Sequence, residues 1–189
     1  MISFIAGNIL LYLFKSSTVR SRFVGGFQLT SGSSPAELGA SVPPAWKLTS
    51  LRYYLAHNAE LYVIATPDSG IARSFRYSPG AFSLDVIVWA IPMGVLLLSG
   101  YLVANQHELR SISEAVFRGS SVLYGYTIAA ILGTLFVEIV VRGNNVTMEM
   151  GPTTGSVILL VGIVWPILFG GAGGVVSFIL RESTKEVTP

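Results

Sequence analysis

Three runs of the sequence are long and apolar enough to cross a lipid bilayer as helices. They cover residues 82–104, 120–141 and 155–180. The hydrocarbon core of a bilayer is about 30 Å thick, and a helix of about 20 residues spans it. Asp85 lies at the edge of the first run, Glu138 is the one charged residue of the second, and the third has none. This pattern predicts a polytopic membrane protein.

The composition agrees with this interpretation and excludes several kinds of site. Only 12% of the 189 residues are charged, against about 25% in soluble domains, and the mean hydropathy is +0.63. The chain has no cysteine, which excludes disulfides, thiolate metal sites and thiol catalysis. Its net charge of +2 is too small and too dispersed to indicate nucleic-acid binding.

The N-terminal segment 1–14 contains a shorter apolar run, "ISFIAGNILLYLF". Its 13 residues reach only about 20 Å as a helix. Lys15 follows the run, whereas a signal peptide carries its basic residues first. We therefore expect a first membrane helix that is short or lacks its upstream part. A helix lying in the membrane interface is the alternative.

Residues 15–81 form the only large polar region. Residues 29–44 are rich in serine, glycine and proline and show no helical or strand period. Residues 46–66 have the period of an amphipathic helix. Its apolar face would carry Leu48, Leu51, Leu55, Ala59 and Tyr62, and its polar face Thr49, Tyr53, His57 and Glu60. We expect it to lie on the membrane surface or cap the bundle, the alternative being a fifth, polar span packed inside the bundle.

Glycines are concentrated near the end of the third run, at positions 170, 171, 173 and 174. A dinucleotide-binding loop would need another glycine at position 176, where the chain has valine. No Gly-Lys-Ser/Thr sequence follows to bind a phosphate. The glycines therefore favour close packing between helices over ligand binding.

Small residues spaced by four would form ridges on two consecutive membrane helices. One ridge contains Gly162, Pro166, Gly170 and Gly174, and the other Ser121, Gly125, Ala129 and Gly133. In lipid, such ridges let two backbones approach closely. We predict that the two helices form a tight antiparallel pair. Pro92 and Pro166 each lie inside a membrane run and are expected to bend their helices.

Few residues offer catalytic or metal-binding chemistry. The two histidines, His57 and His107, lie in different polar segments without a second ligand at metal spacing. No nucleophile-elbow or zinc-protease motif occurs. His57 and Glu60 stand three residues apart and would be able to share a proton, although such a pair also suits a solvated helix face. The sequence thus predicts no catalytic residue, no metal site and no cofactor.

Glu138 and His57 are the candidates for a proton or ion relay, and Glu138 is the more telling of the two. An ionisable residue inside a membrane run indicates function by default. Arg142, however, lies four residues later, so Glu138 is also placed to pair with it near the interface. Both interpretations stay open.

Short-loop charges predict that both termini are cytoplasmic. Arg110 and Arg118 lie between the first two long runs, and Arg181 and Lys185 in the tail 181–189. The connection between the last two runs has only Arg142, and basic loops stay inside. A second basic group opposes this assignment, formed by Lys15, Arg20 and Arg22.

Several stretches, taken in order, resemble an uncharacterised family of small integral membrane proteins from halophilic archaea, some of them labelled transporters. The matching stretches are "WK" at 46–47, "AH" at 56–57, "GYLVA" ending at 104 after Pro92, "GSSVLYGY" at 119–126 and "WPILFGGAGG" at 165–174. The family has a longer basic lead-in, a tyrosine where this chain has Trp165, and more acidic loops. The resemblance implies a fold and a habitat, and carries no catalytic residues.

Together these patterns predict an all-α membrane bundle of about four helices and one amphipathic surface helix. The expected division is a first helix in 1–14, a polar region in 15–81, a three-helix region in 82–180 and a tail in 181–189. We expect a non-enzymatic protein of the lipid bilayer, transport-related or an accessory subunit, forming homo-oligomers or binding other membrane subunits. The alternative is a proton- or cation-coupled transporter that uses Glu138.

Overall fold

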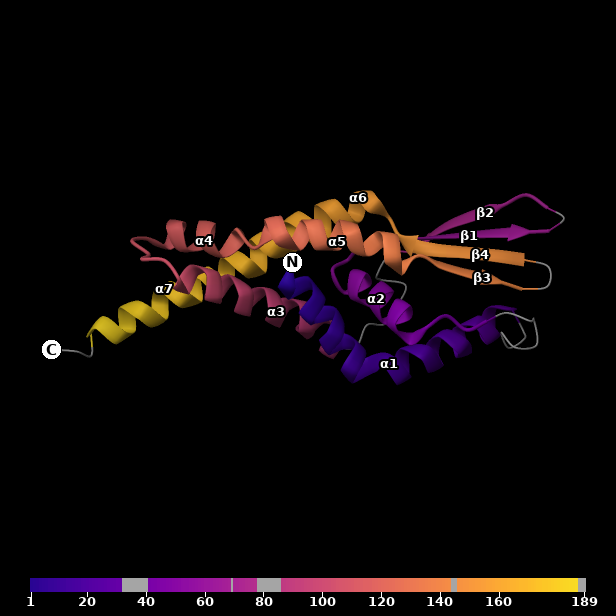
Figure 1. The fold of residues 1–189 in the computed structure, drawn as a ribbon, viewed down its shortest axis with the longest axis horizontal. Helices are drawn as coiled ribbons and strands as arrows, with labels where there is room; N and C mark the ends of the chain where they lie inside the picture. The colour runs from indigo at the N-terminus through magenta and orange to yellow at the C-terminus, as the bar shows by residue number, and fades with distance from the viewer. Residues whose placement is uncertain (32–40, 69, 78–85, 144–145, 187–189) are drawn as a thin grey trace.

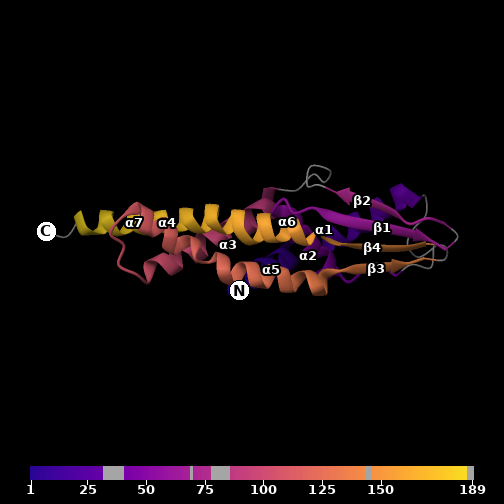
Figure 2. The same cartoon turned by 90° about the horizontal axis from the view of Figure 1, so that it is seen from above.

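The computed structural model describes residues 1–31, 41–68, 70–77, 86–143 and 146–186. They form an elongated helical bundle with an antiparallel sheet extending from one end (Figures 1 and 2). The helices are α1 (Ile2–Ser31), α2 (Ala45–Ala56), α3 (Val86–Asn105), α4 (Ile112–Ser120), α5 (Leu123–Val137), α6 (Thr154–Ser156) and α7 (Gly171–Glu186). Two π-helical segments, η2 (Val157–Val164) and η3 (Pro166–Gly170), join α6 to α7. The strands are β1 (Leu61–Pro67), β2 (Arg73–Tyr77), β3 (Ile139–Arg142) and β4 (Val146–Pro152).

The described residues contain four helical segments long and apolar enough to cross a membrane. They are Ile2–Val24, Val86–Asn105, Ile112–Val137 and Thr154–Ser183. Their number agrees with the four helices predicted. The first is longer than expected, because the helix that begins in the apolar run does not end at residue 14 but continues through the polar residues to Ser31. The third segment combines α4 and α5, and the fourth extends from α6 through η2 and η3 into α7.

The antiparallel sheet is a correction to the prediction of an all-α fold. Its strand order is β2-β1-β4-β3. Strand β4 pairs with β1, with Val63 opposite Met150, and with β3, with Ile139 opposite the same Met150. The sheet was not predicted because its two halves are short and lie far apart in the sequence, so that each strand depends on long-range pairing.

Helix α2 ends ten residues before the predicted end of the amphipathic helix at 66. Asn58 adopts a left-handed conformation with φ of 60°, which asparagine tolerates better than most residues. The Asn58 N–H donates to the Leu55 carbonyl at 2.9 Å, and the Ala59 N–H to the Tyr54 carbonyl at 3.2 Å. These two bonds form a Schellman motif, which terminates the helix. The chain then continues into β1.

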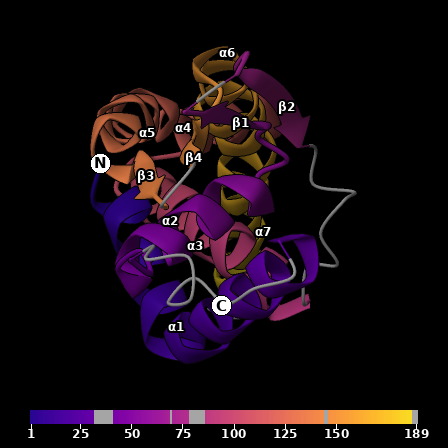
Figure 3. The ribbon, with the colours of Figure 1, turned by 90° about the vertical axis from the view of Figure 1, so that its right-hand side faces the viewer.

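Helix α2 is not a surface helix, in contrast to the prediction. Viewed along the bundle, it lies between α1, α3, α5 and the sheet (Figure 3). Its buried residues are Leu48, Thr49, Leu51, Tyr53, Tyr54, Leu55 and Ala56, and they come from every side of the helix. Tyrosines account for the difference, because hydrogen bonds within the bundle allow these polar residues to be buried.

Glycines bring three helical segments into backbone contact. A Cβ atom on Gly100 of α3 would overlap the backbone of Gly170 at the end of η3. One on Gly174 of α7 would overlap the Ala115 carbonyl of α4, and one on Gly119 of α4 would again overlap Gly170. Small residues therefore set the spacing of α3, α4 and the last helical segment.

The two membrane segments predicted to pair do pack against each other, α5 against η2 and α4 against η3 and α7. The glycines of the two predicted small-residue ridges, however, do not meet one another. Gly125 of α5 lies against the backbone of Met1, and Gly133 against Tyr54 and Phe4. The partners of Gly170 and Gly174 are in α3 and α4, as described above, and only Gly162 of η2 contacts α5, at Thr127. The period of four identified residues that pack closely, but it contains no information about which helix they meet.

Pro166 stands at the start of η3 and has no N–H to donate. The Thr127 hydroxyl donates to the carbonyl of Gly162, four residues before the proline, at 2.6 Å. This bond ties α5 to η2. Pro92, the other predicted bend, is buried within α3.

We expect Gly100→Ala to lower the melting temperature of the detergent-solubilised protein, because its Cβ would overlap Gly170. Overpacking of this kind costs about 1–3 kcal/mol. Gly94→Ala is the matched control in the same helix, since nothing lies within 4 Å of its Cβ position. Thermal unfolding followed by tryptophan fluorescence measures both. Equal melting temperatures for the two variants would contradict the close approach of α3 and η3.

Candidate functional site

The residues with proton-transfer chemistry that the structure brings together are Tyr53, His57 and Tyr126, which we call the His57 cluster. Tyr53 lies in α2, His57 directly follows α2, and Tyr126 lies in α5. All three side chains are 0% exposed. In the described part of the chain, no group of three or more His, Cys, Asp or Glu residues is placed to hold a metal ion.

Three hydrogen bonds join the His57 cluster. The Tyr53 and Tyr126 hydroxyl oxygens are 2.8 Å apart. His57 Nε2 lies 2.6 Å from the Tyr126 hydroxyl, and His57 Nδ1 lies 2.8 Å from the Tyr53 carbonyl oxygen. The last contact satisfies a carbonyl of the final turn of α2, which has no partner within the helix.

The acceptor at Nδ1 determines the direction of every bond in the cluster. A carbonyl oxygen only accepts, so His57 Nδ1 carries a hydrogen and donates it. In the neutral ring Nε2 then accepts, and the Tyr126 hydroxyl is its donor. The Tyr126 oxygen in turn accepts from the Tyr53 hydroxyl. The bonds thus form a closed circuit that begins and ends on Tyr53.

Aromatic rings surround the polar atoms of the cluster. Phe4 of α1 meets Tyr53 and Tyr126 edge-on, with ring centroids 5.4 Å and 5.2 Å apart. On the other side the Trp165 ring lies 4.9 Å from that of His57, and Phe169 lies 4.9 Å from Trp165. Trp165 stands between η2 and η3. Apolar rings keep water from the hydrogen bonds and strengthen them.

Burial keeps the cluster neutral near pH 7. It lowers the pKa of His57 from 6.5 to about 4, although the hydrogen bond to the Tyr53 carbonyl acts in the opposite direction. Burial also raises the pKa of Tyr53 above its ordinary value. A low dielectric disfavours the charged form of each group, imidazolium or phenolate. The cluster therefore holds transferable protons without carrying charge.

His57 does not share a proton with Glu60, as one reading of their spacing proposed. Both ring nitrogens of His57 have other partners. Glu60 lies beyond the end of α2, where its N–H donates to the Ser156 hydroxyl at 3.0 Å and its carbonyl accepts from the Thr153 N–H at 2.8 Å. The left-handed turn at Asn58 removes the helical geometry that would have placed the two side chains on one face.

Glu138 stands at the junction between α5 and β3, where it is exposed. Its carboxylate accepts from the Tyr62 hydroxyl at 3.2 Å. Its carbonyl oxygen accepts from Lys47 Nζ at 2.6 Å, so a cation caps the C-terminal end of α5. Because α5 ends at Val137, Glu138 and Arg142 are not one helical turn apart, as their spacing predicted. The geometry here ties α5 to α2 and β1.

Sequence reasoning singled out His57 but missed its partners. Tyr53 and His57 are four residues apart in and just after α2, a spacing at which they meet. Tyr126 follows 69 residues after His57 in the sequence, and no local pattern relates the two. The signal for Tyr126 was the presence of this tyrosine in an otherwise apolar run, 120–141.

A family model described as a family of unknown function (DUF7978) matches residues 1–181. The chain belongs to this family. The match includes the first three candidate membrane helices, all but the last two residues of the fourth, the sheet and the His57 cluster. Neither a curated protein nor a solved structure matches the chain. Membership agrees with the expected uncharacterised family, whereas an origin in halophilic archaea stays a prediction.

We expect the stability of the protein to fall as the pH is lowered from about 6.5 to about 4. The unfolded chain then binds a proton at His57 that the folded chain excludes, so folding loses stability on the order of 3 kcal/mol. His57→Gln should be less stable at pH 7 but lose less on acidification. Thermal unfolding in detergent across this pH range measures both. Parallel curves for the two proteins would contradict a buried neutral histidine.

Proposed function

We propose that the chain is an integral membrane protein that acts as an accessory subunit, holding its sheet outside the bilayer for a partner. It has no catalytic role in this proposal. The four apolar helical segments support the membrane assignment. The sheet extends beyond α3 and α5 at one end of the molecule, with the later part of α1 running alongside it (Figure 1).

The observation that carries the membrane assignment is the large apolar surface on the outside of the bundle. Exposed large apolar side chains occur on α3, α5 and the last helical segment. Examples are Leu98 at 59%, Leu135 at 72%, Phe136 at 66% and Leu168 at 60% exposure. Water-soluble monomers rarely expose continuous surfaces of this kind. Lipid, a second copy or another membrane subunit would cover them.

The packing of the bundle favours an accessory role over that of a pore. Backbone meets backbone where Gly100 and Gly119 contact Gly170, and where Gly174 contacts Ala115. Such crossings leave no room between α3, α4 and η3 for water or a hydrated ion at these levels. The ionisable residue expected to line a pathway, Glu138, is exposed at the start of the sheet.

Proton-coupled transport is the second candidate, and one specific observation favours it. The bonds of the His57 cluster run from the Tyr53 hydroxyl through Tyr126 to His57 Nε2. A continuous chain of hydroxyl and imidazole groups is able to pass protons. In this version of the transport hypothesis His57 replaces Glu138 as the central residue.

Reconstitution into proteoliposomes separates the two candidates. With a pH-sensitive dye inside and an imposed proton gradient, we expect the protein to give no flux above that of empty vesicles. A flux that His57→Gln abolishes, while Glu138→Gln retains it, would establish the transport function and overturn the accessory proposal. A flux lost with Glu138→Gln, in a variant that still folds, would instead support the relay predicted at that residue.

The orientation that we propose places the sheet outside the cell and both termini inside. Arg181 donates to the backbone carbonyls of Asn105 and His107, which places the connection after α3 and the C-terminal part of α7 at the same end. That end lies opposite the sheet (Figure 2). Arg110 in this connection favours its retention in the cytoplasm.

Single-cysteine labelling tests the orientation directly, because the chain has no cysteine. We expect a membrane-impermeant maleimide to label Thr66→Cys in intact cells, and Gln106→Cys only after permeabilisation. Both positions are exposed, Thr66 in β1 and Gln106 at the opposite end. The reverse labelling pattern would show that the protein has the opposite orientation in the membrane. Labelling of both cysteines in intact cells would contradict the membrane assignment.

A further inference from the structure

Strand β2 forms an edge of the sheet as far as the described residues show. It pairs with β1 on one side, with Ala65 opposite Arg73 and Val63 opposite Phe75. The side chains of Arg73, Ser74, Phe75 and Arg76 are all exposed. An edge strand offers backbone N–H and C=O groups to which another strand can add.

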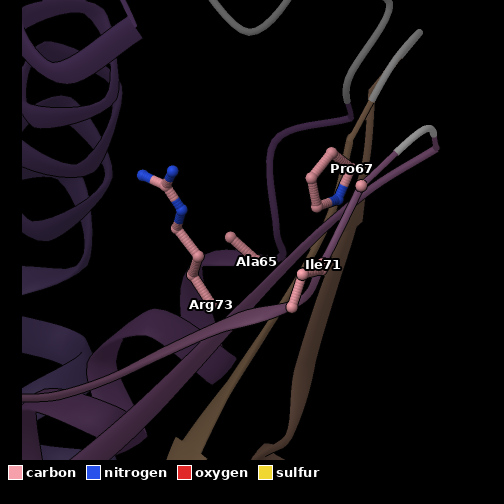
Figure 4. A pocket seen from close by; sticks show the side chains of 5 residues that line it. Ala65, Pro67, Ile71 and Arg73 are labelled. Atoms are coloured by element: carbon pink, nitrogen blue, oxygen red, sulfur yellow. The ribbon is translucent and has the colours of Figure 1, made fainter.

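A groove of about 590 Å³ lies at the end of the hairpin that connects β1 to β2. Ala65, Pro67, Gly70, Ile71 and Arg73 line it (Figure 4). Ile71 is 89% exposed. Arg73 stands beside Ala65 with its guanidinium group directed away from the strands (Figure 4). The groove therefore combines an apolar lining with one cation at the start of the edge strand.

The charges of this edge favour an acidic occupant. Neither Arg73 nor Arg76 has an ion pair or hydrogen bond with a described residue. Asp68 is the one acidic residue of the hairpin and is exposed near its tip. The two arginines are three positions apart, so they stand on opposite faces of the sheet. Phe75, half exposed, lies on the same face as Arg73.

From these observations we propose that β2 and its groove bind an acidic, extended segment of a partner protein by strand addition. An added antiparallel strand alternates its side chains in the same way as β2. Four successive residues of the added strand would then lie opposite Arg76, Phe75, Ser74 and Arg73, in that order. The first and the fourth of them would be acidic, to pair with the two arginines, and the second would be apolar, to contact Phe75. This inference rests on the proposed accessory role and names the chemistry of the partner.

A fluorescent octapeptide with glutamate-valine-threonine-glutamate at its centre tests the proposal against the full-length protein in detergent. We expect saturable binding by anisotropy that weakens with salt. The double variant Arg73→Glu with Arg76→Glu should lose about tenfold or more in affinity. A peptide with lysine in place of both glutamates should bind this variant better than the wild type. Arg110→Glu, which changes an exposed charge at the opposite end, is the matched control and should bind normally.

Two further measurements distinguish strand addition from other binding. A peptide with alternate backbone nitrogens methylated keeps every side chain but loses backbone donors, and it should not bind; equal binding would overturn strand addition. Micelles containing anionic phospholipid should not displace the peptide, and displacement would assign the edge to lipid headgroups instead. If the peptide does not bind at millimolar concentration, the proposal of strand addition is wrong, but the accessory role is unaffected. The accessory role fails only if the reconstituted protein conducts protons.

Discussion

The arrangement of the bundle depends on direct contact between helix backbones. Gly100, Gly119, Gly170 and Gly174 lie where α3, α4 and the last helical segment cross, with no space for a side chain. In lipid, apolar side chains gain little by leaving the solvent, so close contact and dispersion supply the attraction between helices. Glycine maximises that contact. Once these segments are fixed, their neighbours α1 and α5 enclose α2, which does not itself belong to the four candidate spans.

Because α2 is buried, its polar side chains need hydrogen-bond partners within the protein. Tyr54 donates to the Ala130 carbonyl at 2.6 Å, and the His57 cluster satisfies its own donors and acceptors in a circuit. An unbonded hydroxyl in this environment would cost about 1–3 kcal/mol. The same bonds attach α2 to α5, and β3 follows α5 directly. The bundle therefore positions the sheet, which is the part with an exposed edge.

The features predicted correctly from sequence are those with a local signal. Each of the three long apolar runs is sufficient by itself to identify a helix long enough for a membrane. The run at residues 2–14 is not, because the helix that contains it becomes long enough only by continuing through the polar residues that follow. Glycine spacing identified positions of close approach, but Gly125 and Gly133 meet α1 and α2 instead of the ridge that contains Gly170. The end of α2 had a local signal at Asn58 that was not used. The pairing of β1 with β4 had none, since the strands are about 80 residues apart in the sequence.

By itself, the sequence determined that its three long apolar runs are able to cross a membrane as helices, and which residue types are able to bring helices together. Hydropathy and side-chain size are properties of each residue, so no tertiary contact is needed to read them. Only the tertiary structure decided which glycine meets which helix, that His57 is buried against Tyr126, and that Glu138 lies at a junction with the sheet. These outcomes depend on contacts between distant segments. The free energy of each contact is set by what surrounds the two groups after folding. A chemically identical residue in another environment would therefore take a different role.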